Sequence, residues 1–338
     1  MTTIKAYAAT APKSPLQPFE YEPGPLGDDQ VDVAVSYCGI CHSDLSMIEN
    51  EWGMTAYPLV AGHEVIGAVT AVGDHVKNLK VGQTVGVGWY SGSCMSCQQC
   101  MSGDHNLCAT AEATIIHRHG GFATSVRALS SWVVPLPEGI DAAKAGPLFC
   151  GGITVFNPIL QFGIKPTDRV GVIGIGGLGH MALKFLHAWG CDVVAFTSSD
   201  SKREEALQLG ANRVVNSRNP DDLNKLAGSL NFILSTVNVS LDWQTLIGAL
   251  APKGRLHTVV AVAEPVSLAA FPMLVGQRSF SGSPLGSPAT TATMLEFAAR
   301  HGIAPTTEHF PMSKINDALE HLKSGQARYR IVLENDLN

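Results

Sequence analysis

The chain has 338 residues, of which 45% are hydrophobic and 15% charged, and its formal net charge is −6. This composition describes a well-packed globular protein, long enough for two domains, and excludes an intrinsically disordered chain. Nucleic-acid binders usually carry a basic face or tail, and no block of Lys and Arg occurs here, so we expect no nucleic-acid partner.

The first segment, MTTIKAYAATAPKSP, lacks the basic stretch and apolar core of a secretory signal. No apolar run approaches the roughly 20 residues that a membrane-spanning helix needs. We therefore expect a cytoplasmic protein without a membrane partner. In that compartment clustered cysteines hold metal more often than they form disulfides.

Residues 1–150 predict an irregular domain rich in strands. Short β-branched runs at 31–38, 64–73 and 84–89 are separated by Gly and Pro. Alternating apolar residues with frequent turns favour a compact barrel-like or Greek-key arrangement.

Within this region four cysteines follow the pattern C-x2-C-x2-C-x7-C, namely Cys94, Cys97, Cys100 and Cys108. The pattern begins like a bacterial iron–sulfur motif, which continues with x3-C-P. Here the fourth cysteine follows seven residues later and precedes Ala109. The cluster is therefore expected to hold metal, with an iron–sulfur cluster as the rival of zinc.

Three further segments, each containing glycine, offer metal ligands: YCGICHSDL (37–45), AGHEVIG (61–67) and PLFCGGIT (147–154). Two thiolates and one imidazole leave a tetrahedral zinc with one position open, which distinguishes a catalytic zinc from a structural one. A lone His is more often structural, and the spacing alone does not join Cys41, His63 and Cys150.

From residue 151 apolar strands alternate with amphipathic helices. Such a rhythm predicts right-handed crossovers and a parallel, doubly wound sheet. The C-terminal segment leaves this rhythm, which suggests that the chain returns to the first domain. We expect strands at 169–174, 191–199, 213–217, 230–238, 255–262 and 329–335, and helices at 180–190, 201–211, 221–228, 241–254, 288–302 and 314–325.

The segment GIGGLG (174–179) closes the first of these strands and opens a helix, which is the context that a dinucleotide-binding G-x-G-x-x-G requires. Gly174 permits the tight turn, Gly176 lets the backbone approach the pyrophosphate, and Gly179 lets helix and strand pack closely.

The end of the next strand distinguishes NAD from NADP, because an NAD site places Asp or Glu there. This chain has Thr197, Ser198 and Ser199, followed by Lys202 and Arg203. Hydroxyls and cations suit a 2′-phosphate, so NADP(H) is favoured. Two alternatives stay open: the cations begin a solvated helix face, or Asp200 weakens the phosphate site.

Together the segments CGICHSDLSMIENEWG, YPLVAGHEVIG, GPLFCGGITVF, VGVIGIGGLGH and FPMSKINDAL resemble the zinc-dependent medium-chain alcohol dehydrogenases over nearly the whole chain. The pattern GHE-x2-G-x5-G-x2-V (62–76) is specific to that family. Within it the chain resembles the cinnamyl alcohol dehydrogenase-like branch, particularly bacterial NADPH-dependent broad-range aldehyde reductases. The resemblance implies a GroES-like catalytic domain (1–150 and 287–338, with a structural zinc lobe at 93–108) and a Rossmann cofactor domain (151–286).

The resemblance also assigns roles to residues. It implies two zinc ions per chain, one catalytic at Cys41, His63 and Cys150 with Glu64 close by, and one structural at the four clustered cysteines. Asp44 matches the carboxylate that orients the ligating imidazole, and Ser43 matches the hydroxyl that starts the proton relay. Coenzyme contacts are implied for Thr154, Gly174, Ile175, Gly176, Gly177, Leu178, Gly179, Thr197, Ser198, Ser199, Lys202, Thr236, Ser283, Pro284 and Leu285.

The implied activity is reversible reduction of aliphatic and aromatic aldehydes to primary alcohols by a homodimer. Trp52, Trp89 and Tyr90 lie near the proposed ligands in the sequence and are candidates to line the substrate pocket. Many relatives carry a histidine where this chain has Ser46, so the outer member of the relay is not assigned. The alternatives are an NAD-dependent polyol or alcohol dehydrogenase of the same family, and a non-catalytic relative that binds NADPH.

Overall fold

The computed structural model describes residues 3–337, without the side chain of Asp200. Its contacts divide the chain into two compact units. Thr154–Leu285 form one, and the residues up to Ile153 together with those from Gly286 onward form the other. Within residues 3–337 no helix combines the length and apolar character needed to cross a membrane.

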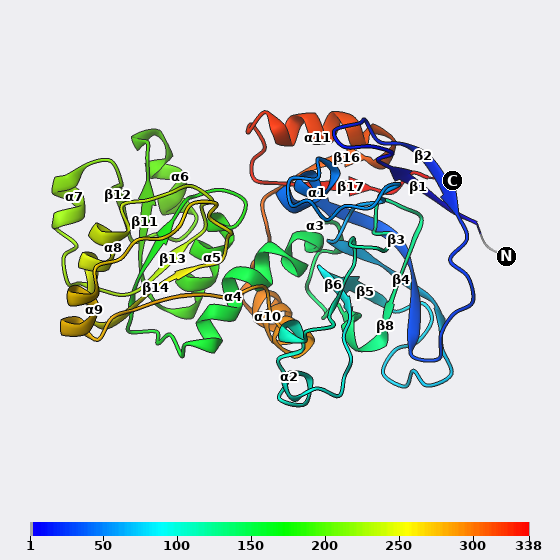
Figure 1. Cartoon of the computed structure of the whole chain (residues 1–338), viewed down its shortest axis with the longest axis horizontal. Coiled ribbons are helices and arrows are strands. Elements are labelled where there is room, and N and C mark those ends of the chain that lie inside the picture. The colour runs from blue at the N-terminus through cyan, green and yellow to red at the C-terminus, as the bar shows by residue number, and fades with distance from the viewer. Residues whose placement is uncertain (1–2, 338) are drawn as a thin grey trace. The chain divides into compact units, whose positions relative to one another are not determined.

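The unit Thr154–Leu285 is built on a six-stranded parallel sheet (Figure 1). Its strand order is β12-β11-β10-β13-β14-β15, the 3-2-1-4-5-6 order of a dinucleotide-binding fold. The strands are β10 (Arg169–Ile173), β11 (Asp192–Thr197), β12 (Arg213–Asn216), β13 (Leu230–Ser235), β14 (Leu250–Thr258) and β15 (Ser279–Gly282). The helices are α5 (Gly179–Trp189), α6 (Arg203–Gln208), α7 (Pro220–Asn224), α8 (Trp243–Ala249) and α9 (Ala270–Gly276), with α4 (Gly151–Gln161) at the entry to the unit. The expected doubly wound sheet is confirmed.

Helix α5 shows how this unit is held together. Ala182, Phe185 and Leu186 recur at helical spacing and are almost completely buried, and the helix packs against β10 and β11. The helix ends at Gly190, whose φ of +102° closes the last turn in the left-handed region that glycine adopts readily.

The second unit is centred on a seven-stranded, mostly antiparallel sheet of order β16-β17-β3-β4-β5-β9, with β8 also paired to β3. The C-terminal strand β17 pairs antiparallel with β3, so the first and last parts of the chain share one sheet (Figure 1). The strands are β1 (Ile4–Ala8), β2 (Gln17–Tyr21), β3 (Gln30–Ile40), β4 (Val65–Val72), β5 (Thr84–Val87), β6 (Tyr90–Gly92), β7 (Glu112–Ala113), β8 (Ser125–Leu129), β9 (Val134–Pro135), β16 (Thr307–Pro311) and β17 (Arg330–Glu334). The helices are α1 (His42–Ile48), α2 (Gln98–Met101), α3 (Ala142–Ala145), α10 (Pro288–His301) and α11 (Ile315–Lys323).

The predicted boundary between the helix at 241–254 and the strand at 255–262 was wrong. The helix expected at 241–254 ends at Ala249, and β14 begins at Leu250. Leu250 is fully buried and pairs with Leu230, and the register then shifts before Arg255 pairs with Phe232. Burial of Leu250 against the neighbouring strand therefore prevails over the helical pattern.

Candidate active site and metal centres

The first turn of α1 presents the residues of the CHSD segment (41–44). Cys41 is the N-cap, and its backbone N–H donates to Asp44 Oδ2 at 2.9 Å, the reciprocal bond of a capping box. This local interaction fixes the start of the helix. It thereby fixes the position of the Cys41 thiol.

Asp44 also connects α1 to the loop before β4. Its Oδ1 accepts hydrogen bonds from the Gly62 backbone N–H and from His63 Nδ1, both at 2.8 Å, and Asp44 and His63 are fully buried. Because Nδ1 is bound to the carboxylate, Nε2 is left as the metal-facing nitrogen. Burial alone would lower the pKa of His63, but Asp44 raises it well above its ordinary value. The more basic ring is a stronger electron-pair donor to a metal ion.

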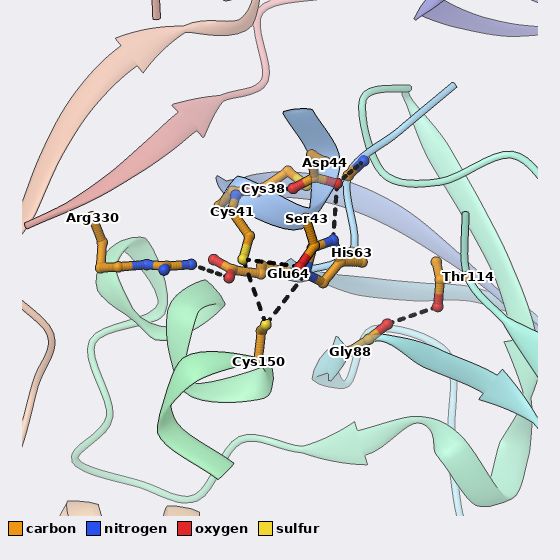
Figure 2. Close-up of polar contacts among 12 residues, drawn as sticks. Cys38, Cys41, Ser43, Asp44, His63, Glu64, Gly88, Thr114, Cys150 and Arg330 are labelled. Atoms are coloured by element: carbon orange, nitrogen blue, oxygen red, sulfur yellow. Dashed lines mark hydrogen bonds and ion pairs between the residues drawn. The ribbon is translucent and has the colours of Figure 1, made fainter. Parts of the chain in front are cut away.

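His63 Nε2 and the two thiols meet at one point (Figure 2). Cys150 Sγ lies 3.3 Å from His63 Nε2 and 3.8 Å from Cys41 Sγ. A tetrahedral zinc with Zn–S bonds of about 2.3 Å has sulfur atoms about 3.8 Å apart, so these donors fit zinc without rearrangement. Hydrogen bonding from Cys150 holds the pKa of the Cys41 thiol well below its ordinary value, and the same contact raises the pKa of Cys150. Without metal the pair therefore shares one proton, which a zinc ion would displace.

Glu64 completes a group of four donors whose ligand atoms all lie within 4.8 Å of one another. Its Oε1 accepts a short hydrogen bond from Arg330 Nη2, and Oε2 has no hydrogen-bond partner among the described residues. Burial raises the pKa of Glu64 to about 7 despite the opposing charge of Arg330. Sequence reasoning missed Arg330, and the one available signal is a cation within the apolar strand YRIVLEN (329–335).

The two serines of α1 have different neighbours. Ser43 Oγ lies 3.8 Å from Cys41 Sγ, beside the metal donors (Figure 2). Ser46, which is 4% exposed, donates a 2.6 Å hydrogen bond to Glu51 Oε2, a partner that sequence reasoning did not identify. Of these two serines, only Ser43 lies beside the metal donors.

Of the three predicted pocket aromatics, Trp89 contacts a metal donor, and Trp52 packs on Trp89. The Trp89 ring meets His63 edge-on with centroids 4.9 Å apart, and Trp52 meets Trp89 at 5.9 Å. Thr114 holds the backbone that carries Trp89. Its backbone N–H donates to the Trp89 carbonyl at 2.7 Å, and its hydroxyl donates to the Gly88 carbonyl at 2.7 Å. Tyr90 packs instead on Trp132, with centroids 5.3 Å apart.

The clustered cysteines form a second four-donor group. Cys94 Sγ lies 4.0 Å from Cys100 Sγ and 3.6 Å from Cys108 Sγ, again close to the edge of a zinc tetrahedron. Backbone N–H groups of Cys97 and Cys100 point at the sulfur atoms three residues earlier, at 3.3 and 3.5 Å. Backbone hydrogen bonds lower the pKa of Cys94 to about 5. Four thiols with no other donor type suit a closed structural zinc.

In the unit Thr154–Leu285 a cavity of about 650 Å³ opens over the glycine loop. Gly174 has a φ of +88°, and a Cβ on Gly179 would lie 1.8 Å from the Gly174 carbonyl oxygen, so both positions require glycine. Gly176 faces open space. Thr236 holds the turn by donating to the carbonyls of Ile173 and Gly174 at 2.9 and 2.8 Å.

The cavity also reaches the ends of β11 and β12. Thr197, Ser198 and Lys202 line it, whereas Arg203 turns away and donates to the Val214 carbonyl at 3.2 Å. Ser217 and Arg218 line the cavity as well. Sequence reasoning missed both residues, because they reach the cavity only if β12 is the strand that pairs with β11. The side chain of Asp200 lies outside the described part of the structure.

The remaining predicted coenzyme residues do not line this cavity: Thr154, Gly179, Ser199, Ser283, Pro284 and Leu285. Ser283 Oγ bonds His257 Nε2 at 2.9 Å, and the other nitrogen of that buried ring bonds Ser281 Oγ at 2.9 Å. His257 is therefore a structural partner of the Ser283 segment that sequence reasoning missed.

Two family models match the chain. Residues 27–138 match the alcohol dehydrogenase GroES-like domain, and residues 177–300 match the zinc-binding dehydrogenase model. The first match contains Cys41, His63 and the clustered cysteines, and the second begins within the glycine loop, at Gly177.

Similar proteins extend over nearly the whole chain. An aldehyde reductase of Synechocystis sp. is 57% identical over 99% of this chain and 100% of its own length. The solved structure of a cinnamyl alcohol dehydrogenase of Sorghum bicolor is 37% identical with a TM-score of 0.93, covering 98% of each chain. A CAD of Helicobacter pylori in complex with NADP(H) is 28% identical with a TM-score of 0.88, also covering 98% of each chain.

Proposed function

The chain belongs to the zinc-dependent medium-chain alcohol dehydrogenase family, and we propose that it reduces aldehydes to primary alcohols with NADPH, reversibly. The arrangement of Cys41, His63 and Cys150 with Ser43 beside them carries this proposal. The aldehyde reductase of Synechocystis sp. supports the substrate class.

Each residue of the site has a separate role in the proposed reaction. Cys41, His63 and Cys150 would hold the catalytic zinc, which supplies Lewis acidity toward a carbonyl oxygen. Asp44 fixes the tautomer and orientation of His63. Ser43 Oγ donates the proton that the product oxygen requires. Trp52 and Trp89 offer an apolar wall for aliphatic or aromatic side chains of the substrate.

The unit Thr154–Leu285 would hold NADPH, whose nicotinamide supplies the hydride. The glycine loop suits the pyrophosphate at the start of α5. The hydroxyl of Ser198 and the ammonium of Lys202 suit the 2′-phosphate, and both line the cavity.

Nicotinamide absorbance with NADPH and then NADH, against butanal, hexanal, benzaldehyde and cinnamaldehyde, tests the activity. We expect rapid NADPH oxidation with several of these aldehydes, and the trend with chain length then describes the pocket. Turnover with NADH alone would contradict the coenzyme assignment. Absence of turnover with every aldehyde, in protein shown to carry two zinc ions, would contradict the reductase itself.

We further propose that the enzyme is a homodimer. Strand β15 lies at the edge of the parallel sheet, and the helix directly before it exposes Phe271, Leu274 and Val275 at 75, 73 and 72%. Antiparallel pairing of two β15 strands about a two-fold axis satisfies both edges and covers these side chains. Light scattering after gel filtration should give twice the chain mass, and Phe271→Asp should shift the enzyme toward monomer.

The cytoplasm is the compartment we propose. The chain contains eight free cysteines, six of them in the two metal-binding groups, and these need reducing conditions to stay available as ligands.

A further inference from the structure

The ends of strands β11 and β12 are tied together at the mouth of the cavity. Thr197, the last residue of β11, lies in register with Asn216, the last residue of β12. The Thr197 carbonyl accepts hydrogen bonds from the Ser217 backbone N–H at 2.7 Å and from Ser217 Oγ at 3.1 Å. The turn after β12 is therefore fixed beside the turn that carries Ser198.

Arg218 is the next residue in that turn, and its backbone is also fixed. Its N–H donates to Asn216 Oδ1 at 3.0 Å, and Asn219 caps the following helix through the Asp221 N–H at 3.1 Å. Rigid backbone on both sides limits where the side chain can reach. Arg218 is exposed, lines the cavity, and its guanidinium forms no hydrogen bond or ion pair within residues 3–337.

The other charges lining the cavity are Lys202 and Asp242. Asp242 is committed to capping α8, since its oxygens accept from the Thr245 N–H at 3.0 Å and the Thr245 hydroxyl at 2.6 Å. The nearby Arg203 is turned away toward the Val214 carbonyl. Among the described residues, Lys202 and Arg218 are the two cations that line this cavity, and neither side chain forms an ion pair with a carboxylate.

We propose that Arg218 is a specificity-determining residue that binds the 2′-phosphate of NADPH together with Lys202 and Ser198. A phosphate monoester carries about −1.5 to −2 charges at neutral pH, so two cations match it better than one. The planar guanidinium can donate two hydrogen bonds to phosphate oxygens, whereas the neutral 2′-hydroxyl of NADH gives it no charged partner. This inference rests on the NADPH assignment made above.

Binding measurements on the zinc-loaded enzyme test the proposal without turnover. NADPH and NADH are titrated by their fluorescence, and adenosine 2′-monophosphate and 5′-monophosphate by calorimetry. We expect Arg218→Ala to weaken NADPH and the 2′-monophosphate by about 10- to 100-fold, as for loss of a charge-assisted hydrogen bond. NADH and the 5′-monophosphate should change by less than about twofold, and Arg218→Lys should recover part of the loss.

Arg203→Ala is the matched control, because it removes a cation from the same region that points away from the cavity. It should leave all four affinities close to those of the parent. If Arg218→Ala binds NADPH as tightly as Arg203→Ala does, Arg218 has no role in coenzyme choice and the NADPH assignment stands. If the parent enzyme binds NADH as tightly as NADPH, the coenzyme assignment itself fails, and this proposal fails with it.

Discussion

Asp44 Oδ1 accepts a 2.8 Å hydrogen bond from His63 Nδ1, and neither side chain is exposed to solvent. The same carboxylate accepts from the Cys41 and Gly62 N–H groups, so one side chain positions two of the proposed zinc ligands.

Asp44→Asn should therefore weaken zinc at the catalytic site by about 10- to 100-fold, because the amide group presents a donor to at least one of these three N–H groups. Competition with a chelator, read by metal analysis, measures the change. Asp74→Asn, at an exposed carboxylate, is the control. Equal zinc retention in both variants would show that Asp44 does not support the ligands.

Ser43→Ala should lower kcat for aldehyde reduction by about 100-fold or more while leaving KM nearly unchanged, because it removes the hydroxyl that supplies the proton. Stopped-flow absorbance at saturating NADPH measures the loss. Ser46→Ala is the matched control on the same helix, since its hydroxyl bonds Glu51 and no metal donor. A comparable loss in both variants would place the proton path through Ser46.

Cys100→Ser should reduce the zinc content from about two ions per chain to about one and lower thermal stability, because a closed four-thiolate site does not tolerate a missing ligand. Metal analysis of the purified variant gives the count. Cys191→Ala removes a buried cysteine outside both groups and should retain both ions. Two ions in Cys100→Ser would contradict the structural zinc site.

The stability of the enzyme should depend on pH through His257. Burial, with a smaller contribution from Arg255, lowers the pKa of this histidine to about 4 from an ordinary 6.5. Between these values the unfolded chain binds a proton that the folded chain does not. The free energy of unfolding therefore falls as the pH drops through the window, by about 1 kcal/mol at pH 5.5.

Urea unfolding of the parent and of His257→Gln at pH 8.0 and 5.5 measures this contribution. The variant should be less stable at pH 8.0 but should lose less stability on acidification. His187→Gln, at an exposed histidine in the same unit, should keep the parental dependence. An unchanged pH dependence in His257→Gln would exclude His257 as its source.

The sequence could predict those parts of the site whose residues lie close together along the chain. The glycine loop and the clustered cysteines are local patterns, so their chemistry is visible in adjacent residues. Cys41, His63 and Cys150 were joined only through a family resemblance, because a tertiary contact spanning 109 residues leaves no mark on spacing.

Other residues were missed for the same reason. Arg330 meets Glu64 across 266 positions, through the pairing of β17 with β3. Arg218 reaches the cavity because β12 neighbours β11, which a pattern of alternating strands and helices does not specify. Tyr90 opens β6 and Trp89 lies in the bend before it, so the two adjacent rings follow different backbone directions to different neighbours.

The separation of the ligands along the chain sets an order of assembly during synthesis. The outermost cysteines of the structural group are 14 residues apart, and Cys41 and Cys150 are 109 apart. Closing the longer loop costs about 2 kcal/mol more in chain entropy. The structural group can take its metal while the ribosome is still translating, and the catalytic group only later. Glu64 gains its partner last, because Arg330 lies in β17 and is synthesised after the other residues of the site. A nascent chain stalled before β17 lacks this guanidinium, and burial then favours the uncharged form of the Glu64 carboxyl.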